Sequence, residues 1–259
     1  MPMHYEESIQ TAADRAAELL SDDLPILVLT GAGVSVESNI PPFRGEGGLW
    51  DRYDPYEYGH IDTFRVHPER SWEMLREIIE GSMRSMPNEA HRALARMEGK
   101  GWIGPVVTQN VDGLHAMAGT RDLIELHGNA RRIYCMDCGR KEVLDPSTWS
   151  GFSIKCRCSS IKRPDIVFFG EMLPEDALGR AVETASKGPN ILVIGTSGIV
   201  HPAASIPIIA KANGGLLVEI NSQPSEFTGT LTDVFINGPA TLGARALEDA
   251  IQRFFDTSS

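Results

Sequence analysis

The chain has 259 residues, of which 42% are hydrophobic, and its 24 Lys and Arg against 35 Asp and Glu give a formal charge of −11. This composition excludes a disordered or collagen-like chain, and the acidic charge argues against a protein held on nucleic acid by an overall basic surface. No apolar run approaches the roughly 18 residues of a membrane span, and residues 1–10 lack an apolar signal core, so we expect a cytoplasmic protein without membrane association.

Hydrophobic periodicity predicts helices and short apolar strands in alternation. The first helix covers residues 8–20, and an apolar strand follows at 25–30. This alternation predicts an α/β fold with a Rossmann-like, mostly parallel sheet, whose ligands lie outside the carboxyl ends of the strands. The candidate ligand-binding loops therefore begin at Gly31, Gln109, Gly195 and Asn221. Further strands are predicted at 105–108, 191–195 and 216–220, and further helices at 71–80, 88–97, 175–186, 203–212 and 242–255.

Residues 130–163 break this alternation. The stretch contains all four cysteines, several turn residues, and eight Lys and Arg against three Asp and Glu, a local charge of +5. We interpret it as a small module inserted into the larger fold. The predicted organisation is a large Rossmann-like domain formed by residues 1–45, 105–129 and 164–259, a helical segment of a small domain at 46–104, and the cysteine module at 130–163.

Two glycines, Gly31 and Gly33, follow the first predicted strand, where a doubly wound fold places its dinucleotide loop. The full fingerprint has a third glycine where this chain has Val36, so a purely structural turn is the alternative to nucleotide binding. The next residues include a Pro-Pro pair, Phe43, Arg44 and a glycine cluster, which suit a loop that closes over an anionic ligand. The alternative is a surface loop with a solvated Arg44.

Polar side chains follow the second predicted strand. Gln109, Asn110 and Asp112 offer two amides and one acid, which suit ribose hydroxyls and a carboxamide, with turn or capping roles as the alternative. His127 follows another short apolar stretch and precedes a glycine. A histidine with a pKa near neutrality is the usual general base, and a structural histidine is the alternative.

The cysteines form two close pairs. Cys135 and Cys138 enclose two residues, Cys156 and Cys158 enclose one, and 17 residues lie between the pairs. Two such pairs allow tetrahedral thiolate coordination of zinc, whereas disulfides are disfavoured in a reducing cytosol. Four cysteine ligands leave no open coordination position, so we predict one structural zinc ion.

Together and in this order, the motifs resemble those of the sirtuin family of NAD-dependent protein-lysine deacylases. Each motif alone is a weak signal, but their joint occurrence over roughly residues 20–246 is specific. The resemblance implies a Rossmann-like domain with an inserted zinc ribbon, and NAD as the cosubstrate. Besides both cysteine pairs, the motifs are GAGVSVESNIPPFRG at 31–45, TQNVD at 108–112, LHG at 126–128, FGE at 169–171, GTS at 195–197 and IN at 220–221.

The resemblance also implies roles for individual residues. His127 is the expected general base, and Asn110 is the second expected catalytic residue. A substrate peptide would bind as an added strand, mainly through its backbone, at Val111, Val167, Phe169, Gly170 and Glu171. The residues implied to hold NAD are Gly31, Ala32, Gly33, Phe43, Arg44, Gln109, Asn110, Asp112, Gly195, Thr196, Ser197, Asn221 and Ala240.

The reaction implied by the resemblance transfers the acyl group of a substrate lysine to ADP-ribose and releases nicotinamide. The acyl oxygen attacks the ribose carbon that carries nicotinamide, and His127 activates a ribose hydroxyl. Phe43 would shield the reacting centre from water. The expected partners are acyl-lysine proteins or peptides; we expect no direct nucleic-acid binding, and a monomer.

The chain departs from the family pattern at two turns and at one helix. Asn39 replaces the usual glycine, and asparagine tolerates the left-handed backbone conformation; Gly198 is an unusual glycine after the GTS motif. Family members that favour dicarboxylic acyl groups carry Tyr and Arg where our alignment places Leu75 and Ile78. Two apolar residues cannot pair a carboxylate, so we predict deacetylation, and removal of longer neutral acyl groups, over desuccinylation.

Three other functions fit parts of the sequence. Mono-ADP-ribosyl transfer would use the same NAD cleavage with a different acceptor. A zinc-ribbon interaction module with a vestigial NAD site is compatible with the local positive charge. Simple dehydrogenase activity ranks last, because Val36 breaks the glycine fingerprint and no partner acid stands at the usual distance.

Overall fold

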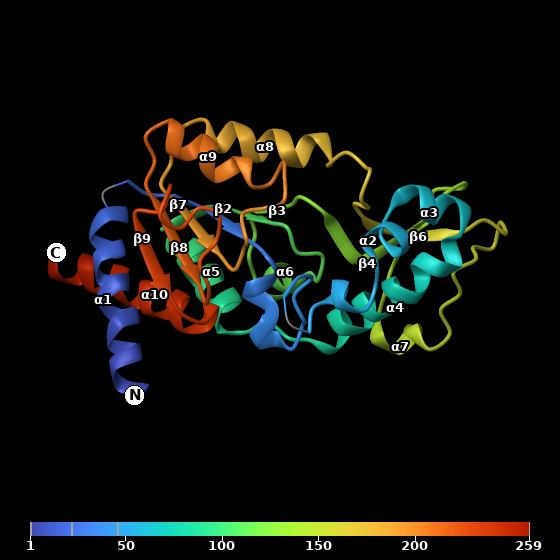
Figure 1. Ribbon diagram of the computed structural model, residues 1–259, viewed down its shortest axis with the longest axis horizontal. Helices are drawn as coiled ribbons and strands as arrows, with labels where there is room; N and C mark the ends of the chain where they lie inside the picture. The colour runs from blue at the N-terminus through green and yellow to red at the C-terminus, as the bar shows by residue number, and fades with distance from the viewer. Residues whose placement is uncertain (1, 22, 46, 259) are drawn as a thin grey trace.

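The computed structural model describes residues 2–21, 23–45 and 47–258, and its centre is a six-stranded parallel sheet (Figure 1). The strand order is β3-β2-β1-β7-β8-β9, and every neighbouring pair is parallel. This confirms the predicted α/β, Rossmann-like class. The strands are β1 (Ile26–Thr30), β2 (Ile103–Thr108), β3 (Leu123–Glu125), β7 (Ile191–Ile194), β8 (Leu217–Asn221) and β9 (Val234–Asn237).

Helices cover both faces of this sheet. Three helices, α1 (Pro2–Leu20), α5 (Glu89–Gly99) and α10 (Ala240–Ser258), share one hydrophobic core with the strands, and α8 (Glu175–Ala185) and α9 (Ser205–Ala212) form a second core on the opposite face (Figure 1). The central strands β1 and β7 are buried at every position. A strand covered on both faces needs apolar side chains at nearly all positions, which is why these runs do not alternate.

The sequence analysis missed two strands of the parallel sheet. β3 has only three residues and β9 only four, too few for a hydrophobic period to be recognised. After β1, the predicted glycine loop continues into a 3-10 helix (η1) over residues Ala32–Ser38. Asn39 ends it with φ 62°, so the asparagine does adopt the left-handed conformation expected of it.

A second, smaller sheet lies beside the first and is antiparallel, with strand order β5-β4-β6. Its core is shared with helices of the predicted 46–104 segment and contains Trp72, Phe64 and Phe168. Of that segment, α2–α4 pack here, whereas α5 packs against α10 beside the parallel sheet. The elements here are β4 (Gly128–Cys135), β5 (Lys141–Val143), β6 (Lys162–Ile166), α2 (Pro55–Tyr58), α3 (Ile61–Val66), α4 (Pro68–Arg84), α7 (Pro146–Trp149) and the short 3-10 helix η2 (Leu49–Asp51), whereas α6 (Leu114–Ala118) packs against α5.

Membrane insertion finds no support in the helices. Within the described ranges, none combines the length and apolarity that crossing a bilayer demands.

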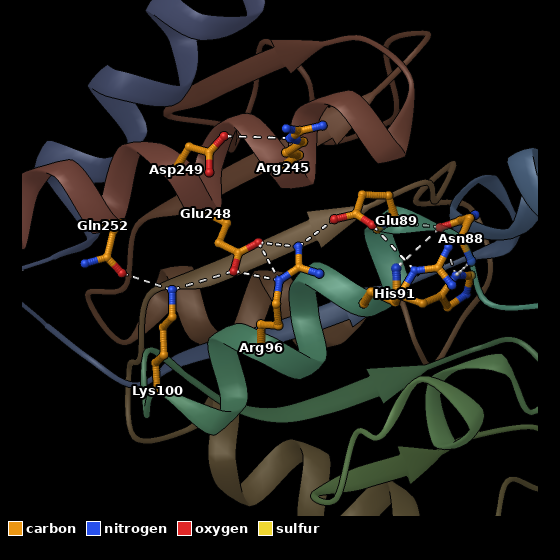
Figure 2. A network of polar contacts seen from close by, with 11 residues as sticks. Asn88, Glu89, His91, Arg96, Lys100, Arg245, Glu248, Asp249 and Gln252 are labelled. Atoms are coloured by element: carbon orange, nitrogen blue, oxygen red, sulfur yellow. Dashed lines mark hydrogen bonds and ion pairs between the residues drawn. The ribbon is translucent and has the colours of Figure 1, made fainter.

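A polar network fastens α5 to α10 (Figure 2). Glu248 is buried, and both of its carboxylate oxygens accept hydrogen bonds from Arg96, at 2.6–3.1 Å. Lys100 Nζ lies 3.7 Å from the same carboxylate, and Arg96 also donates to Glu89 at 2.6 Å. The bidentate geometry and the burial of Glu248 distinguish this pair from an ordinary surface ion pair.

Replacing Glu248 with Ala is expected to lower the free energy of unfolding by about 2 kcal/mol, because it removes the charged bidentate hydrogen bond between the buried carboxylate and Arg96. Urea titration would measure the change. The control is Asp249→Ala on the same helix, since Asp249 is exposed and lies 3.9 Å from Arg245, and a change within about 0.5 kcal/mol is expected there. Equal losses in the two variants would contradict the special role of Glu248.

Candidate active site

Two loops touch backbone to backbone at the carboxyl edge of the parallel sheet. The Gly31 N–H donates to the Ile194 carbonyl (3.0 Å), and the Gly33 N–H donates to the Gly195 carbonyl (2.8 Å). A Cβ added to Gly31 would lie 2.8 Å from the Gly195 oxygen, and one added to Gly33 would lie 2.6 Å from the Gly195 Cα. Both glycines are therefore required by the approach of the two loops, which places residues 31–33 beside the GTS motif.

The loops after β2 and β8 join the same edge. The Gln109 N–H donates to the Thr30 carbonyl (3.0 Å), and its side-chain amide donates to Thr196 Oγ1 (3.0 Å). The Asn221 amide donates to the Thr196 carbonyl (2.9 Å), and Ala240 lies buried at the first position of α10. All four loops expected from the strand pattern thus meet at one edge of the sheet.

Gly198 has a structural explanation. Its φ is +75°, and an added Cβ would lie 3.1 Å from the ring of Phe227. The preceding carbonyl, of Ser197, accepts a hydrogen bond from the Glu226 N–H (3.0 Å). Positive φ and a tight aromatic contact both favour glycine here, so this departure from the family pattern belongs to the packing of the 225–232 turn against the loop.

The side chains of Asp112 and Asn110 are both hydrogen-bonded to Ser35. Ser35 Oγ donates to Asp112 Oδ2 (2.8 Å) and accepts from the Asn110 side-chain amide (3.1 Å). The Leu114 N–H donates to the other Asp112 oxygen (2.9 Å). Burial raises the pKa of Asp112 from its ordinary value, although the bonds from Leu114 and Ser35 act in the opposite direction. The sequence analysis named this serine's loop but gave Ser35 no role.

A cavity of about 230 Å³ opens in front of this polar group. Phe43 lies on its wall and contacts Trp50 (ring centroids 5.5 Å apart), and Trp50 in turn contacts Phe169 (5.7 Å). These aromatic rings connect the glycine-rich loop to the expected substrate segment, while Arg44 is exposed. The lining includes Ala32, Ser35, Ile40, Phe43, Leu49, Ile78, Gly81, Ser82, Asn110, Val111 and Asp112.

His127 is held in one tautomer. Its Nδ1 lies 2.8 Å from the Gln109 carbonyl oxygen, which can only accept, so Nδ1 carries the hydrogen and Nε2 of the neutral ring is an acceptor. Burial lowers the pKa of His127 from its ordinary value, and the bond to Gln109 only partly offsets this. The side chain is partly exposed. His127 is therefore a neutral base near pH 7, as a general base requires.

The expected substrate segment is fixed at three points. The Val167 N–H donates to the His127 carbonyl (3.0 Å), which ties the segment directly to the candidate base. Phe169 pairs through its backbone with Gly59 and Ile61 (2.9 and 3.0 Å). The structure thus brings the expected catalytic and substrate residues together.

The four cysteines lie at one end of the small sheet and form one cluster. Their sulfur atoms all lie within 4.8 Å of one another, and the Cys135–Cys158 and Cys138–Cys156 sulfur distances are 3.4 and 3.7 Å. Tetrahedral ligands about 2.3 Å from a zinc ion stand about 3.8 Å apart, so this cluster fits a single ion. The prediction that these four residues can hold one zinc ion agrees with this geometry.

A buried histidine pair behind the site has no counterpart in the sequence analysis. His91 and His115 are buried and in contact, with ring centroids 4.7 Å apart. His115 Nε2 bonds Thr30 Oγ1 (2.9 Å), and His91 Nε2 lies 3.5 Å from Ser35 Oγ. Asn88 and His91 form a capping box at the start of α5, and this spacing is the signal that would have found His91.

Acid should destabilise the fold through this pair. Burial, with a smaller contribution from Arg92, lowers the pKa of His91 from 6.5 to about 4, and burial also lowers the pKa of His115. Between these pH values the unfolded chain binds a proton that folded His91 does not, so stability is lost as pH falls from 6.5 towards 4, by about 3 kcal/mol for His91. Urea titrations at several pH values should show this slope reduced in His91→Gln and unchanged in the control His201→Gln, an exposed histidine. An identical slope in His91→Gln would refute the assignment.

Comparison with known proteins decides the family. Residues 31–202 match the profile of the Sir2 family. The chain belongs to the Sir2 (sirtuin) family. An NAD-dependent protein deacylase of Pyrococcus abyssi is 44% identical over 230 residues, covering 86% of this chain and 92% of the relative. A second such deacylase, of Pyrobaculum aerophilum, is 45% identical over 224 residues, covering 86% and 90%.

Solved structures of Sir2 proteins have the same fold. A Sir2 homologue bound to NAD superposes with a TM-score of 0.83 at 37% identity, covering 95% of this chain and 94% of that one. A Sir2 protein in complex with deacetylated p53 peptide and 3′-O-acetyl ADP-ribose superposes with a TM-score of 0.85 at 38% identity, covering 91% and 96%. At this identity and coverage, the Sir2 fold extends over nearly the whole chain.

Proposed function

We propose that this protein is an NAD-dependent protein-lysine deacylase that transfers the acyl group of a substrate lysine to ADP-ribose and releases nicotinamide. The observation that carries the proposal is the geometry of His127. Its ring is neutral, its Nε2 is an acceptor, and its carbonyl is bonded to the expected substrate segment. The Sir2 relatives named NAD-dependent protein deacylase support the same activity.

The residues around the cavity fit NAD. When bound, NAD supplies the ribose that accepts the acyl group and the nicotinamide that departs. Gly31, Ala32 and Gly33 are assigned to the diphosphate, because they form the loop at the carboxyl end of β1, where a parallel α/β sheet binds its ligands. Phe43 lies on the cavity wall, where an aromatic ring excludes water. The adenosine half is assigned to Gly195, Thr196, Ser197, Asn221 and Ala240.

Asn110 and Asp112 are proposed to orient the nicotinamide and its ribose. Their side chains are buried and are fixed by Ser35, so they contribute positioned polar atoms rather than mobile charges. His127 Nε2 is the atom proposed to take the proton of a ribose hydroxyl, while Nδ1–H stays on the Gln109 carbonyl and keeps the ring in orientation.

The proposed substrates are acyl-lysine proteins or peptides, bound beside residues 167–171. The peptide complexes of related Sir2 proteins support this class of partner. The zinc ion is assigned a structural role, since four cysteines fill its coordination positions. A cytoplasmic, monomeric protein without direct nucleic-acid binding stays a prediction from composition and charge.

Mass spectrometry of the products tests the proposal. Incubation of the protein with NAD and an acetyl-lysine peptide is expected to give deacetylated peptide, nicotinamide and O-acetyl-ADP-ribose in equal amounts. If ADP-ribose instead appears covalently attached to protein, the activity is mono-ADP-ribosyl transfer. If NAD is not consumed at all, the site is vestigial, and the deacylase proposal fails.

The acyl preference provides a separate prediction. Ile78 lies on the cavity wall, Leu75 is fully buried in the adjoining core, and the cavity rim carries Glu77, Glu80 and one cation, Arg84, which is paired with Glu80. Among the described residues that line the cavity, a carboxylate would meet two acids and no cation other than the paired Arg84. Butyryl-lysine and succinyl-lysine peptides have equal chain length, and kcat/KM is expected to be at least about tenfold lower for succinyl. Faster removal of succinyl than butyryl would disprove the prediction.

A further inference from the structure

Arg163, at the second position of β6, is a buried cation that also lies over the rings of Phe64 and Tyr134, and its shortest hydrogen bonds go to residues in or beside the substrate segment. Its two terminal nitrogens each donate to one carboxylate oxygen of Glu171, at 2.8 Å. One of them also donates to the Ile166 carbonyl (2.7 Å). The guanidinium lies over the ring of Phe168, 4.7 Å from its centroid. These hydrogen-bond partners and Phe168 belong to the last residues of β6 or to the 168–171 turn.

Glu171 also forms two hydrogen bonds with the Phe168 backbone within the 168–171 turn. One of its carboxylate oxygens accepts the Phe168 N–H (3.0 Å), and its own N–H donates to the Phe168 carbonyl (3.1 Å). Gly170 between them has φ +84°, and an added Cβ would lie 2.7 Å from His60 Nε2. The turn therefore depends on the left-handed conformation of Gly170 and on the Glu171 carboxylate, whose oxygens already accept hydrogen bonds from Arg163 and from the Phe168 N–H.

Arg163 and Glu171 each stabilise the charged form of the other. Burial alone would lower the pKa of Arg163, but the bonds with Glu171 outweigh it and raise that pKa. Burial alone would raise the pKa of Glu171, but the bonds from Arg163 and the Phe168 N–H lower it. Both groups are thus charged at neutral pH and form a bidentate, partly desolvated pair, the strong type of protein ion pair.

We propose that Arg163 and Glu171 act as a positioning pair that holds the 168–171 turn in its peptide-binding shape. Glu171 then contributes to substrate binding through its backbone, while its side chain is committed to Arg163 and does not read the peptide. Arg163 is a positioning residue that reaches the substrate only through this turn. The inference rests on the proposed deacylase function, and it adds one residue outside the family motifs, Arg163, to the machinery of that site.

Steady-state kinetics of Glu171→Gln and Arg163→Lys test the pair, with peptide varied at saturating NAD and NAD varied at saturating peptide. Glu171→Gln keeps the shape of the side chain but loses its charge, whereas Arg163→Lys keeps the charge but loses the planar guanidinium, so both variants lose the charged bidentate bond. The KM for an acetyl-lysine peptide is expected to rise about tenfold in each, with kcat and the KM for NAD changed less than about twofold. The double variant should be no worse than either single one, because both remove the same interaction.

The matched control is Glu142→Gln, which removes the ion pair of Glu142 with Lys162, the residue before Arg163, without touching the turn. Its peptide KM should equal that of the unmodified protein. A peptide panel separates positioning from direct readout: a loss confined to peptides with a basic residue beside the acyl-lysine would mean that Glu171 contacts substrate, and would overturn the proposal. So would an unchanged peptide KM in both folded single variants.

The failure of the inference can be told apart from failure of the proposed function. If the unmodified protein does not turn over acetyl-lysine peptide, the deacylase proposal itself fails. If it does, and the variants retain its KM, only the positioning pair is refuted. Thermal melting of each variant by circular dichroism confirms that the comparison is made between folded proteins.

Discussion

Replacement of His127 by Ala is expected to reduce kcat for deacylation by about 10²–10⁴-fold, the range that a general base contributes. The ring is partly exposed and is hydrogen-bonded to the Gln109 carbonyl, so its loss should leave the fold and NAD binding largely intact. Product formation would be followed by mass spectrometry, and NAD affinity by calorimetry. Exposed His67 provides the control, and His67→Ala should retain full activity.

The pH dependence of the unmodified enzyme checks the same assignment. Because burial lowers the pKa of His127 below its ordinary value of 6.5, the acid limb of kcat should have its midpoint below pH 6.5, and the rate should be level around pH 7. The base must be neutral to act, so activity falls as pH falls through this pKa. Retained turnover in His127→Ala, or a midpoint above 7, would show that another group is the base.

Loss of one zinc ligand is expected to have the second large effect. Cys135→Ala should abolish stoichiometric zinc binding, because the remaining three sulfurs form an incomplete tetrahedral site, and metal binding is coupled to folding in such modules. Amide hydrogen exchange should then speed up in β5 and in the turns around the cysteines, while the parallel sheet keeps its protection. Deacylation should fall through loss of peptide affinity, since β6 carries Arg163.

Asp137→Asn is the control for the cysteine variant, because Asp137 is exposed between the first two cysteines and is not among the clustered ligands. Zinc content measured by atomic emission should stay near one ion per chain in this control. A Cys135→Ala protein that is metal-free, fully protected from exchange and fully active would rule out a structural zinc.

The central strands were predictable because burial on both faces requires a run of apolar residues, and such a run is visible in the sequence. A strand buried on both faces must be apolar at nearly every position; β7 is apolar throughout, and β1 is apolar except for the hydrogen-bonded Thr30 at its end. β3 and β9 were missed because three or four residues fit a buried strand and a loop equally well. The close contact of η1 with the Gly195 loop was not predictable, because Gly33 and Gly195 are distant in sequence.

The same distinction between local sequence pattern and long-range packing applies to the residues of the site. Candidate ligand-binding residues could be proposed where the chemistry depends on residue type and local spacing, as for Asn110, Asp112 and the cysteines. His91 and His115 were not found, because a histidine's environment depends on packing between α5, α6 and β1 that no local pattern records. The lowered pKa of His127 likewise follows from burial in the folded chain.

The antiparallel pairing of β4 with β6 has one further consequence. Gly128 pairs with Ile166 at one end of this ladder, and Cys135 pairs with Lys162 at the other end, beside the cysteine cluster. The chain therefore enters and leaves the cysteine module on two neighbouring strands. The residues between these two paired strands form a loop whose ends are held together by the ladder. Lengthening such a loop costs little conformational entropy. Insertions beyond this pairing that leave the four cysteines in place should therefore be tolerated, while His127 and Val167 stay bonded at the other end of the ladder.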